Sequence, residues 1–320
     1  YAVPLKGRNL ALLAVSLFFY AWGERIYVVI MVASTLIDYT HGMLVERCKA
    51  RGNDRGARWA VASSVFFNLA LLGFFKYWDF LAASFQAVGL NFMPVLNIHL
   101  PIGISFYTFQ SMGYLIDVYR GKYAPDRNPF RFALFVSFFP QILQGPIGRY
   151  DRLASQLYGQ KSFSLTRIER GLQLMLWGYF KKIVIADRAA VVVSEVFGNY
   201  QSYGGILVMA GVLCYSLQLY GDFSGGMDVI MGAAECFGIS LDANFKRPYF
   251  AQSISDFWHR WHITLGTWMK DYVFYPFSLS KGMNKFGKFC KKHFGKHVSR
   301  VLPVCIANLL VFFLVGVWHG

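Results

Sequence analysis

Long stretches of the chain carry no charged side chain, and the charged positions gather in short segments between them. A helix that spans a bilayer needs about 20 mostly apolar residues, within a range of roughly 17–25. Runs of this kind, or close to it, occupy residues 9–23, 25–45, 59–75, 80–116, 196–221 and 301–318. The pattern predicts an all-α, polytopic membrane protein with about eight helical passages, several of them imperfect.

Two apolar runs depart from a plain spanning helix. The run at 80–116 contains Pro94 and Pro101, so we expect loop before Pro101 and helix after it. The run at 132–148 ends in the sequence FPQILQGPIG, which is a poor helix former. Non-helical backbone at membrane depth is tolerated only inside protein or beside a water-filled cavity. We therefore predict that 132–148 is re-entrant, entering and leaving on the same side.

The composition agrees with lipid as the main solvent. Of the 320 residues, 55% are hydrophobic and 15% are charged, whereas an average soluble domain carries about 25% charge. These values exclude a disordered chain and a disulfide scaffold. The formal net charge is +15, which in a soluble protein would suggest nucleic acid as the partner. In a membrane protein the same excess gathers in cytoplasmic loops, so we expect membrane lipids and no nucleic acid as partners.

Loop charge predicts an orientation. Segments 46–58, 119–131 and 149–170 are basic, whereas 76–101 holds Lys76 as its one Lys or Arg. The positive-inside rule places the basic segments in the cytoplasm and 76–101 outside.

The most basic region is 246–300, where eleven Lys and Arg stand against two Asp, a net charge of +9. On a helix, one face would carry Lys281, Lys285, Lys288, Lys292 and Lys296. Such a helix would lie on an anionic leaflet. A solvated basic loop is the alternative, because Gly282, Gly287 and Gly295 weaken a helix.

Polar groups at membrane depth are costly and usually functional, and the segment DFWHRWH at 256–262 holds two of them. On a continuous helix His259 and His262 would share a face. The zinc-protease pattern needs His at i and i+4 with an intervening Glu, and neither condition is met. We expect His259 to lie at the membrane interface beside Trp258 and Trp261, and His262 to point inward.

Three further polar segments have both structural and functional interpretations. His319 in GVWHG ends an uncharged run, and the residues alone leave a packing and a catalytic role open. The segment YGDFSGGMD at 220–228 lacks the P-loop Gly-Lys-Ser/Thr, and its plain interpretation is a helix-connecting turn capped by Asp222 and Ser224. Charged residues at 181–188 are expected to pair with one another or to reach the interface.

Several stretches together resemble the membrane-bound O-acyltransferases, and in particular the bacterial branch typified by the membrane subunit of alginate O-acetylation. The stretches are SLFFYAWGE (16–24), PIGISFYTFQSMGYLIDVYRG (101–121), FVSFFPQILQGPIGRY (135–150), FKKIVIADR (180–188), YGDFSGGMD (220–228), NFKRPYFAQSISDFWHRWHITLGTWMKDYVFYP (244–276) and GVWHG (316–320). They extend over nearly the whole chain.

The resemblance implies a ring of membrane helices around a thinned core, where two funnels meet at a buried histidine. It implies one transmembrane domain over 1–320, which we expect to be incomplete at both termini. His319 is then the catalytic histidine and His262 the second functional one. Donor or substrate binding would fall to Arg260, Trp261, Asn244, Asp222 and Trp318, with no metal and no bound cofactor.

The resemblance also implies transfer of an acetyl group across the bacterial cytoplasmic membrane. The donor would be acetyl-CoA or an acyl carrier in the cytoplasm, and the acceptor a cell-surface polysaccharide, reached directly or through a periplasmic acetyltransferase partner. Two alternatives stay open. One is D-alanyl transfer to teichoic acid from a carrier-protein thioester. The other is a transporter of polysaccharide or lipid intermediates, because broken helices with intramembrane polar groups also suit transport.

Overall fold

The structure, a computed structural model, describes residues 3–4, 7–159 and 161–319. Within these residues the chain forms helices, turns and loops and contains no strand, which confirms the all-α prediction. The chain divides into two compact units, the first made of Tyr1–Asn68 and Pro101–Phe245 and the second of Leu69–Leu100 and Lys246–Gly320. Each unit is described by itself, and one transmembrane domain over 1–320 stays a prediction.

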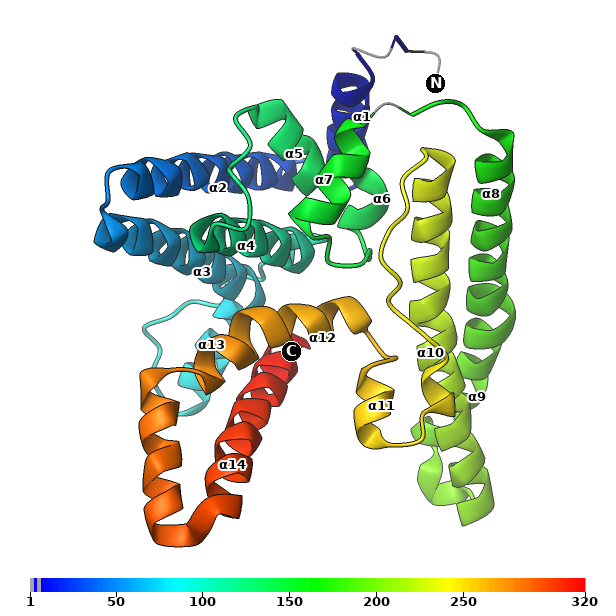
Figure 1. Ribbon diagram of the computed structural model, residues 1–320. Coiled ribbons are helices and arrows are strands. Elements are labelled where there is room, and N and C mark those ends of the chain that lie inside the picture. The colour runs from blue at the N-terminus through cyan, green and yellow to red at the C-terminus, as the bar shows by residue number, and fades with distance from the viewer. Residues whose placement is uncertain (1–2, 5–6, 160, 320) are drawn as a thin grey trace. The chain divides into compact units, whose positions relative to one another are not determined.

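The first unit contains most of the helices (Figure 1). In chain order they are α1 (Arg8–Gly23), α2 (Tyr27–Ala50), the start of α3 (Asp54–Ala87), α4 (Ile104–Arg120), α5 (Pro129–Ser137), α6 (Phe139–Ile142), α7 (Tyr150–Tyr158), α8 (Leu165–Tyr179), a π-helical segment (Phe180–Ala186), α9 (Asp187–Gly198), a 3₁₀ turn (Tyr200–Ser202) and α10 (Gly205–Cys236).

The second unit contains the end of α3 and the helices of the last 75 residues. They are a 3₁₀ turn (Pro248–Phe250), α11 (Ile254–Trp258), α12 (Ile263–Met269), a π-helical segment (Lys270–Phe274), α13 (Tyr275–Ser278) and α14 (Lys281–His319).

Four helices of the described chain are long and apolar enough to cross a membrane, namely α2, α3, α10 and α14. They indicate a multi-pass membrane protein. The other predicted passages fall on shorter helices, such as α1 with 16 residues and α4 with 17. Passage of those helices through the bilayer stays a prediction.

Contacts within the first unit bring its basic segments together. The Lys49 ammonium donates a hydrogen bond to the carbonyl of Tyr119, and Arg127 lies 3.4 Å from Glu46. The segments 46–58 and 119–131 therefore share one end of the unit, as the loop charges predict, and their cytoplasmic location stays a prediction.

The two proline-containing runs follow their predictions in part. The expected loop at 80–101 is wrong for residues 80–87, because helix α3 continues to Ala87. Helix α4 begins at Ile104, just after Pro101 and the left-handed Gly103 (φ +76°). In 132–148, α5 stops at Ser137 and α6 lasts four residues before irregular backbone follows. Phe135 is fully buried, and its carbonyl accepts a hydrogen bond from Gln110 at 2.6 Å. In the irregular part, Pro146 and Ile147 are buried, and the Gln141 amide donates to the carbonyl of Pro146 at 2.5 Å. Part of the non-helical backbone is thus enclosed in protein, and its entry and exit on one side of the membrane stay a prediction.

The interpretation of 220–228 as a turn is wrong, because helix α10 runs unbroken through it. A Cβ atom added at Gly225 would lie 2.7 Å from the carbonyl oxygen of Gly178, and one at Gly171 would lie 2.6 Å from that of Gly232. Figure 1 shows α8 and α10 side by side along their length. The glycines therefore permit close helix packing, which outweighs their low helix propensity.

The charged residues at 181–188 pair across the same helices. The Lys181 ammonium lies 2.7 Å from the Asp228 carboxylate and donates to the Ser224 hydroxyl at 2.9 Å. Lys182 lies 2.9 Å from Asp187 and 2.7 Å from Asp222. The predicted pairing within 181–188 is confirmed for Lys182 and Asp187, and both lysines also bind α10.

The basic segment after residue 280 is a helix and not a loop. Helix α14 includes Gly282 and Gly287 and departs from helical geometry at Gly295 (φ +86°). The Ser299 hydroxyl donates to the carbonyl of Gly287 at 2.9 Å, so the two halves of α14 fold back on each other (Figure 1). The predicted contact of its lysine face with a membrane surface stays a prediction.

Candidate active site

His262 occupies an unusual backbone position at the start of α12. Helix α11 ends at Trp258, and the chain turns so that His262 precedes α12 in the left-handed region (φ +46°, ψ +50°). Few non-glycine residues adopt this conformation, because it strains the backbone. Residues with such strained backbone are found most often at functional sites. The side chain of His262 is only 5% exposed, which confirms that it points inward.

The same turn separates His262 from His259. The expected common helical face is wrong, because the helix stops between the two residues. His259 is exposed, and its Nδ1 donates to the carbonyl of Ser255 at 2.7 Å. Exposure suits the predicted position of His259 at an interface, and only His262 enters the interior of the unit.

The second unit brings His262 together with the end of α14. The ring centroids of His262 and His319 are 6.4 Å apart. The Trp318 ring lies edge-on to both, at 4.5 Å from His319 and 6.2 Å from His262. His319 is exposed whereas His262 is buried. This group, called the histidine cluster below, thus joins one buried and one accessible imidazole.

Lys76, from the second-unit part of α3, joins the histidine cluster. Its ammonium donates to the carbonyl of Trp318 and lies 5.9 Å from the centroid of the Trp318 ring. The sequence marks Lys76 as the one Lys or Arg of 76–101, and that isolation is the signal that could have identified it. Nothing in the neighbouring residues links it to Trp318, so sequence reasoning gave it no site role.

The surroundings of His262 favour its neutral form. Burial, and after it the charge of a protonated His319, lower the pKa of His262 to about 4. At neutral pH the imidazole of His262 is therefore unprotonated, with one ring nitrogen able to donate and the other able to accept.

Arg260 and Trp261 shape the turn that carries His262. The Arg260 Nε donates to the Asp256 carboxylate at 2.8 Å, and its carbonyl accepts from the backbone N–H of Lys246 at 2.9 Å. The Trp261 ring stacks on Phe257 at 5.6 Å. These contacts hold the strained backbone, and the predicted role of both residues in donor binding stays a prediction.

Asn244 and Asp222 belong to the first unit, so the structure does not place them in the histidine cluster of the second. Asn244 is 1% exposed, and its amide nitrogen lies 3.6 Å from the sulfur of Met227. Asp222 is exposed and pairs with Lys182. Their roles in donor binding also stay predictions.

The histidine cluster contains groups that can perform acid–base chemistry. An imidazole near neutral pH can take a proton from a hydroxyl, and an ammonium group can stabilise negative charge that develops on an oxygen. His319 is the accessible imidazole and Lys76 the nearby cation. The arrangement suits attack by a hydroxyl on an activated carbonyl.

Comparison with known proteins agrees with this chemistry. Residues 125–320 match the model of the membrane-bound O-acyltransferase family. Over its whole length the chain is 37% identical to the Probable alginate O-acetylase AlgI of Pseudomonas putida, of which it covers 65%. It is 33% identical to the peptidoglycan O-acetyltransferase of Helicobacter pylori, with 98% of the chain and 60% of that protein covered.

A more distant similarity connects the chain to the teichoic acid D-alanyltransferase of Bacillus subtilis. The two are 29% identical over 71% of this chain and 55% of that protein. The chain thus spans less than two thirds of the length of each of these three relatives. The family model covers more than half of the chain, and the chain belongs to the membrane-bound O-acyltransferase family.

Proposed function

We propose that the protein is a membrane O-acyltransferase that passes an acetyl group from acetyl-CoA to hydroxyls of a cell-surface polysaccharide. The acceptor is reached directly or through a periplasmic partner enzyme, and the protein lies in the bacterial cytoplasmic membrane. The observation that carries the proposal is the histidine cluster, with a buried neutral imidazole 6.4 Å from an accessible one. The names of two relatives, an alginate O-acetylase and a peptidoglycan O-acetyltransferase, support the acetyl group.

In the proposed reaction a sugar hydroxyl attacks the thioester carbonyl and His319 takes its proton. The new C–O ester bond forms as the C–S bond breaks, and the thiolate of CoA receives the proton as it leaves. Proton transfer by a positioned imidazole contributes about 10²–10⁴-fold to the rate. His319 could instead carry the acetyl group itself as an acyl-enzyme. In either role, base or acyl carrier, His319 lies at the thioester carbonyl, so its removal abolishes the reaction.

His262 and Lys76 support this step in different ways. The buried His262 lies behind the accessible ring and stays neutral, so it adds no positive charge that would repel a proton on His319. The Lys76 ammonium lies beside the backbone of Trp318, the residue that precedes His319. From there it stabilises the oxyanion that forms when the hydroxyl attacks.

The charge of the second unit supports a nucleotide thioester as donor. Residues 246–300 carry a net charge of +9, and their lysines and arginines can bind the phosphates of CoA. The alternative donor is a D-alanyl carrier protein, which the similarity to the Bacillus subtilis enzyme supports at lower identity.

The proposal is tested with sealed inverted vesicles that carry the full-length protein in the membrane and the polysaccharide in the lumen, with acetyl-labelled CoA added outside. We expect label on the polysaccharide and an equal amount of free CoA, both lowered at least 100-fold by His319→Ala. His99→Ala serves as the matched control because His99 is exposed in the loop after α3, and it should leave the rate unchanged.

Three results would contradict the proposal. Wild-type transfer by His319→Ala would remove the histidine cluster from the chemistry. Acceptance of a D-alanyl carrier protein instead of acetyl-CoA would favour the alternative donor. Movement of polysaccharide across the vesicle membrane without release of CoA would identify a transporter.

A further inference from the structure

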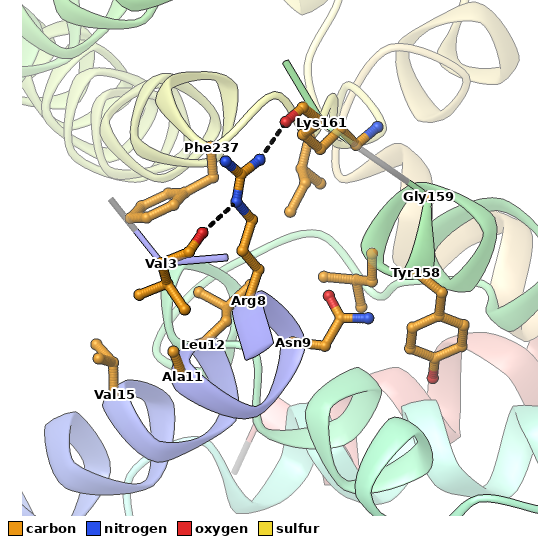
Figure 2. A pocket seen from close by; sticks show the side chains of 12 residues that line it. Val3, Arg8, Asn9, Ala11, Leu12, Val15, Tyr158, Gly159, Lys161 and Phe237 are labelled. Carbon is orange, nitrogen blue, oxygen red and sulfur yellow. Dashed lines mark hydrogen bonds between the residues drawn. The ribbon is translucent and has the colours of Figure 1, made fainter. Parts of the chain in front are cut away.

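A cavity of about 240 Å³ opens in the first unit between the start of α1, the end of α7 and the segment after α10 (Figure 2). Seven of its twelve lining residues have apolar side chains, namely Val3, Ala11, Leu12, Val15, Leu157, Phe237 and Ile239. Contact of such walls with water is unfavourable, and covering them with an apolar group lowers the free energy. The walls therefore favour an occupant with a hydrocarbon part.

One side of the cavity is cationic. Figure 2 shows the Arg8 guanidinium between two backbone carbonyls, those of Val3 and Lys161. Within the part of the chain that the structure describes, the Lys161 ammonium forms no ion pair with a carboxylate. Burial and the neighbouring charge of Arg167 lower the pKa of Lys161, and Glu235 opposes this effect.

The charges beside the cavity do not balance. Arg167 lies 3.7 Å from Glu235 and donates to the carbonyl of Gly238 at 2.8 Å. Among the described residues there, Lys161 and Arg167 are two cations beside the one carboxylate of Glu235, and the excess of positive charge attracts an anion.

The position of the cavity suits the level of lipid headgroups. Arg8 begins α1, and Phe237 directly follows α10, which is long and apolar enough to span a membrane. The hydrogen bond from Arg8 to the carbonyl of Lys161 places the start of α1 beside the basic segment 149–170. Basic pockets at the cytoplasmic ends of membrane helices are typical sites for anionic headgroups.

We propose that this cavity binds an anionic glycerophospholipid, with one acyl chain along Leu12, Val15 and Phe237 and the phosphate beside Lys161 and Arg8. A neutral lipid would leave the excess charge uncompensated, and a soluble phosphate would leave the apolar walls uncovered. This inference uses neither the acyltransferase reaction nor the histidine cluster, so its test is independent of the test of the proposed function.

The test uses the purified full-length protein in detergent and measures lipid binding by native mass spectrometry. The probes are phosphatidylglycerol, phosphatidylcholine with the same acyl chains, and glycerol phosphate. Lys161→Ala removes one phosphate contact and should weaken phosphatidylglycerol binding about fivefold while leaving phosphatidylcholine binding unchanged. Arg55→Ala is the matched control, because Arg55 is exposed in the basic segment 46–58 and lines no part of the cavity.

Val15→Trp tests the apolar wall, because the indole ring would fill the cavity. Val15 is 51% exposed, so the substitution does not disturb the core. It should weaken the binding of phosphatidylglycerol, while the folded protein is recovered in normal yield. Equal binding of both lipids, equal effects of Lys161→Ala and Arg55→Ala, or competition by glycerol phosphate at the same concentration as the lipid would each overturn the proposal. So would a full-length protein that binds no lipid because one of its own segments fills the cavity.

Discussion

The α8–α10 helix pair and the histidine cluster both hold ionisable side chains among apolar helices, but they use them differently. In the helix pair each lysine of the π-helical segment faces a carboxylate, and glycines bring the two backbones close. In the histidine cluster a strained buried imidazole faces an accessible one, and the neighbouring cation binds a backbone carbonyl. Paired charge holds the helices together. In the histidine cluster the two imidazoles, and a Lys76 that has no carboxylate partner among the described residues, leave groups available for chemistry.

The largest expected effect on stability comes from Lys181 in the helix pair. Lys181→Met leaves the Asp228 carboxylate, which is 20% exposed, without its cation. Removal of one partner of a fully buried ion pair costs about 3–5 kcal/mol, and the partial exposure of Asp228 places this pair at the lower end of that range. We expect a strongly lowered melting temperature for the full-length protein in detergent, with acetyl transfer per folded molecule unchanged.

Lys182→Met is the control for this variant. Lys182 and its partners Asp187 and Asp222 are 46%, 48% and 51% exposed, and an exposed pair contributes only about 0–1 kcal/mol. Equal losses of stability in the two variants would contradict the assignment of Lys181 as the buried structural cation.

A smaller effect is expected from the glycines of the helix pair. A Cβ atom at Gly178 would lie 2.5 Å from the carbonyl of Gly225, so Gly178→Ala forces α8 and α10 apart. Overpacking of this kind costs about 1–3 kcal/mol. Gly73→Ala in α3 is the control, because no atom lies within 4 Å of its added Cβ and alanine favours a helix. Thermal unfolding should show the first variant destabilised and the second unchanged or stabilised. The reverse order would contradict the packing role of Gly178.

An effect on stability similar in size to that of Gly178→Ala concerns pH and His262. The folded pKa is about 4 because the ring is buried, and an unfolded histidine has a pKa of about 6.5. Between these values the unfolded chain binds more protons, so stability is complete above pH 6.5 and falls as the pH drops toward 4. The loss from pH 7.5 to pH 5 is on the order of 2 kcal/mol. His262→Gln should show a smaller acid-induced decrease in melting temperature than the wild type. Identical pH profiles would mean that His262 titrates normally.

The sequence predicts most of the fold because spanning helices depend on local composition. Uncharged runs locate α2, α3 and the second half of α14, and Pro101 marks the start of α4. Glycine-rich stretches mislead, because their effect depends on a partner distant in sequence. Gly221 and Gly225 suggest a turn by themselves, but packed against the π-helical segment and α8, respectively, they allow a continuous helix.

The candidate site is predicted in part. The resemblance to a family identifies His262 and His319, since a lone histidine in an apolar run carries no signal of its role. Their proximity follows from the left-handed turn at His262 and the position of α14, which no local pattern encodes. Lys76 reaches Trp318 from a helix far away in the sequence, so only the fold reveals that contact.

The central claim is that His262 and His319 act as one catalytic centre, and a double-mutant cycle tests it most directly. The measurement is the rate of acetyl transfer per folded molecule in inverted vesicles for His262→Ala, His319→Ala and the double variant of the full-length protein. Residues that act as a unit lose activity together, so the double variant should be no slower than the slower single variant. Losses that multiply in the double variant, or a single variant that retains the wild-type rate, would contradict the claim.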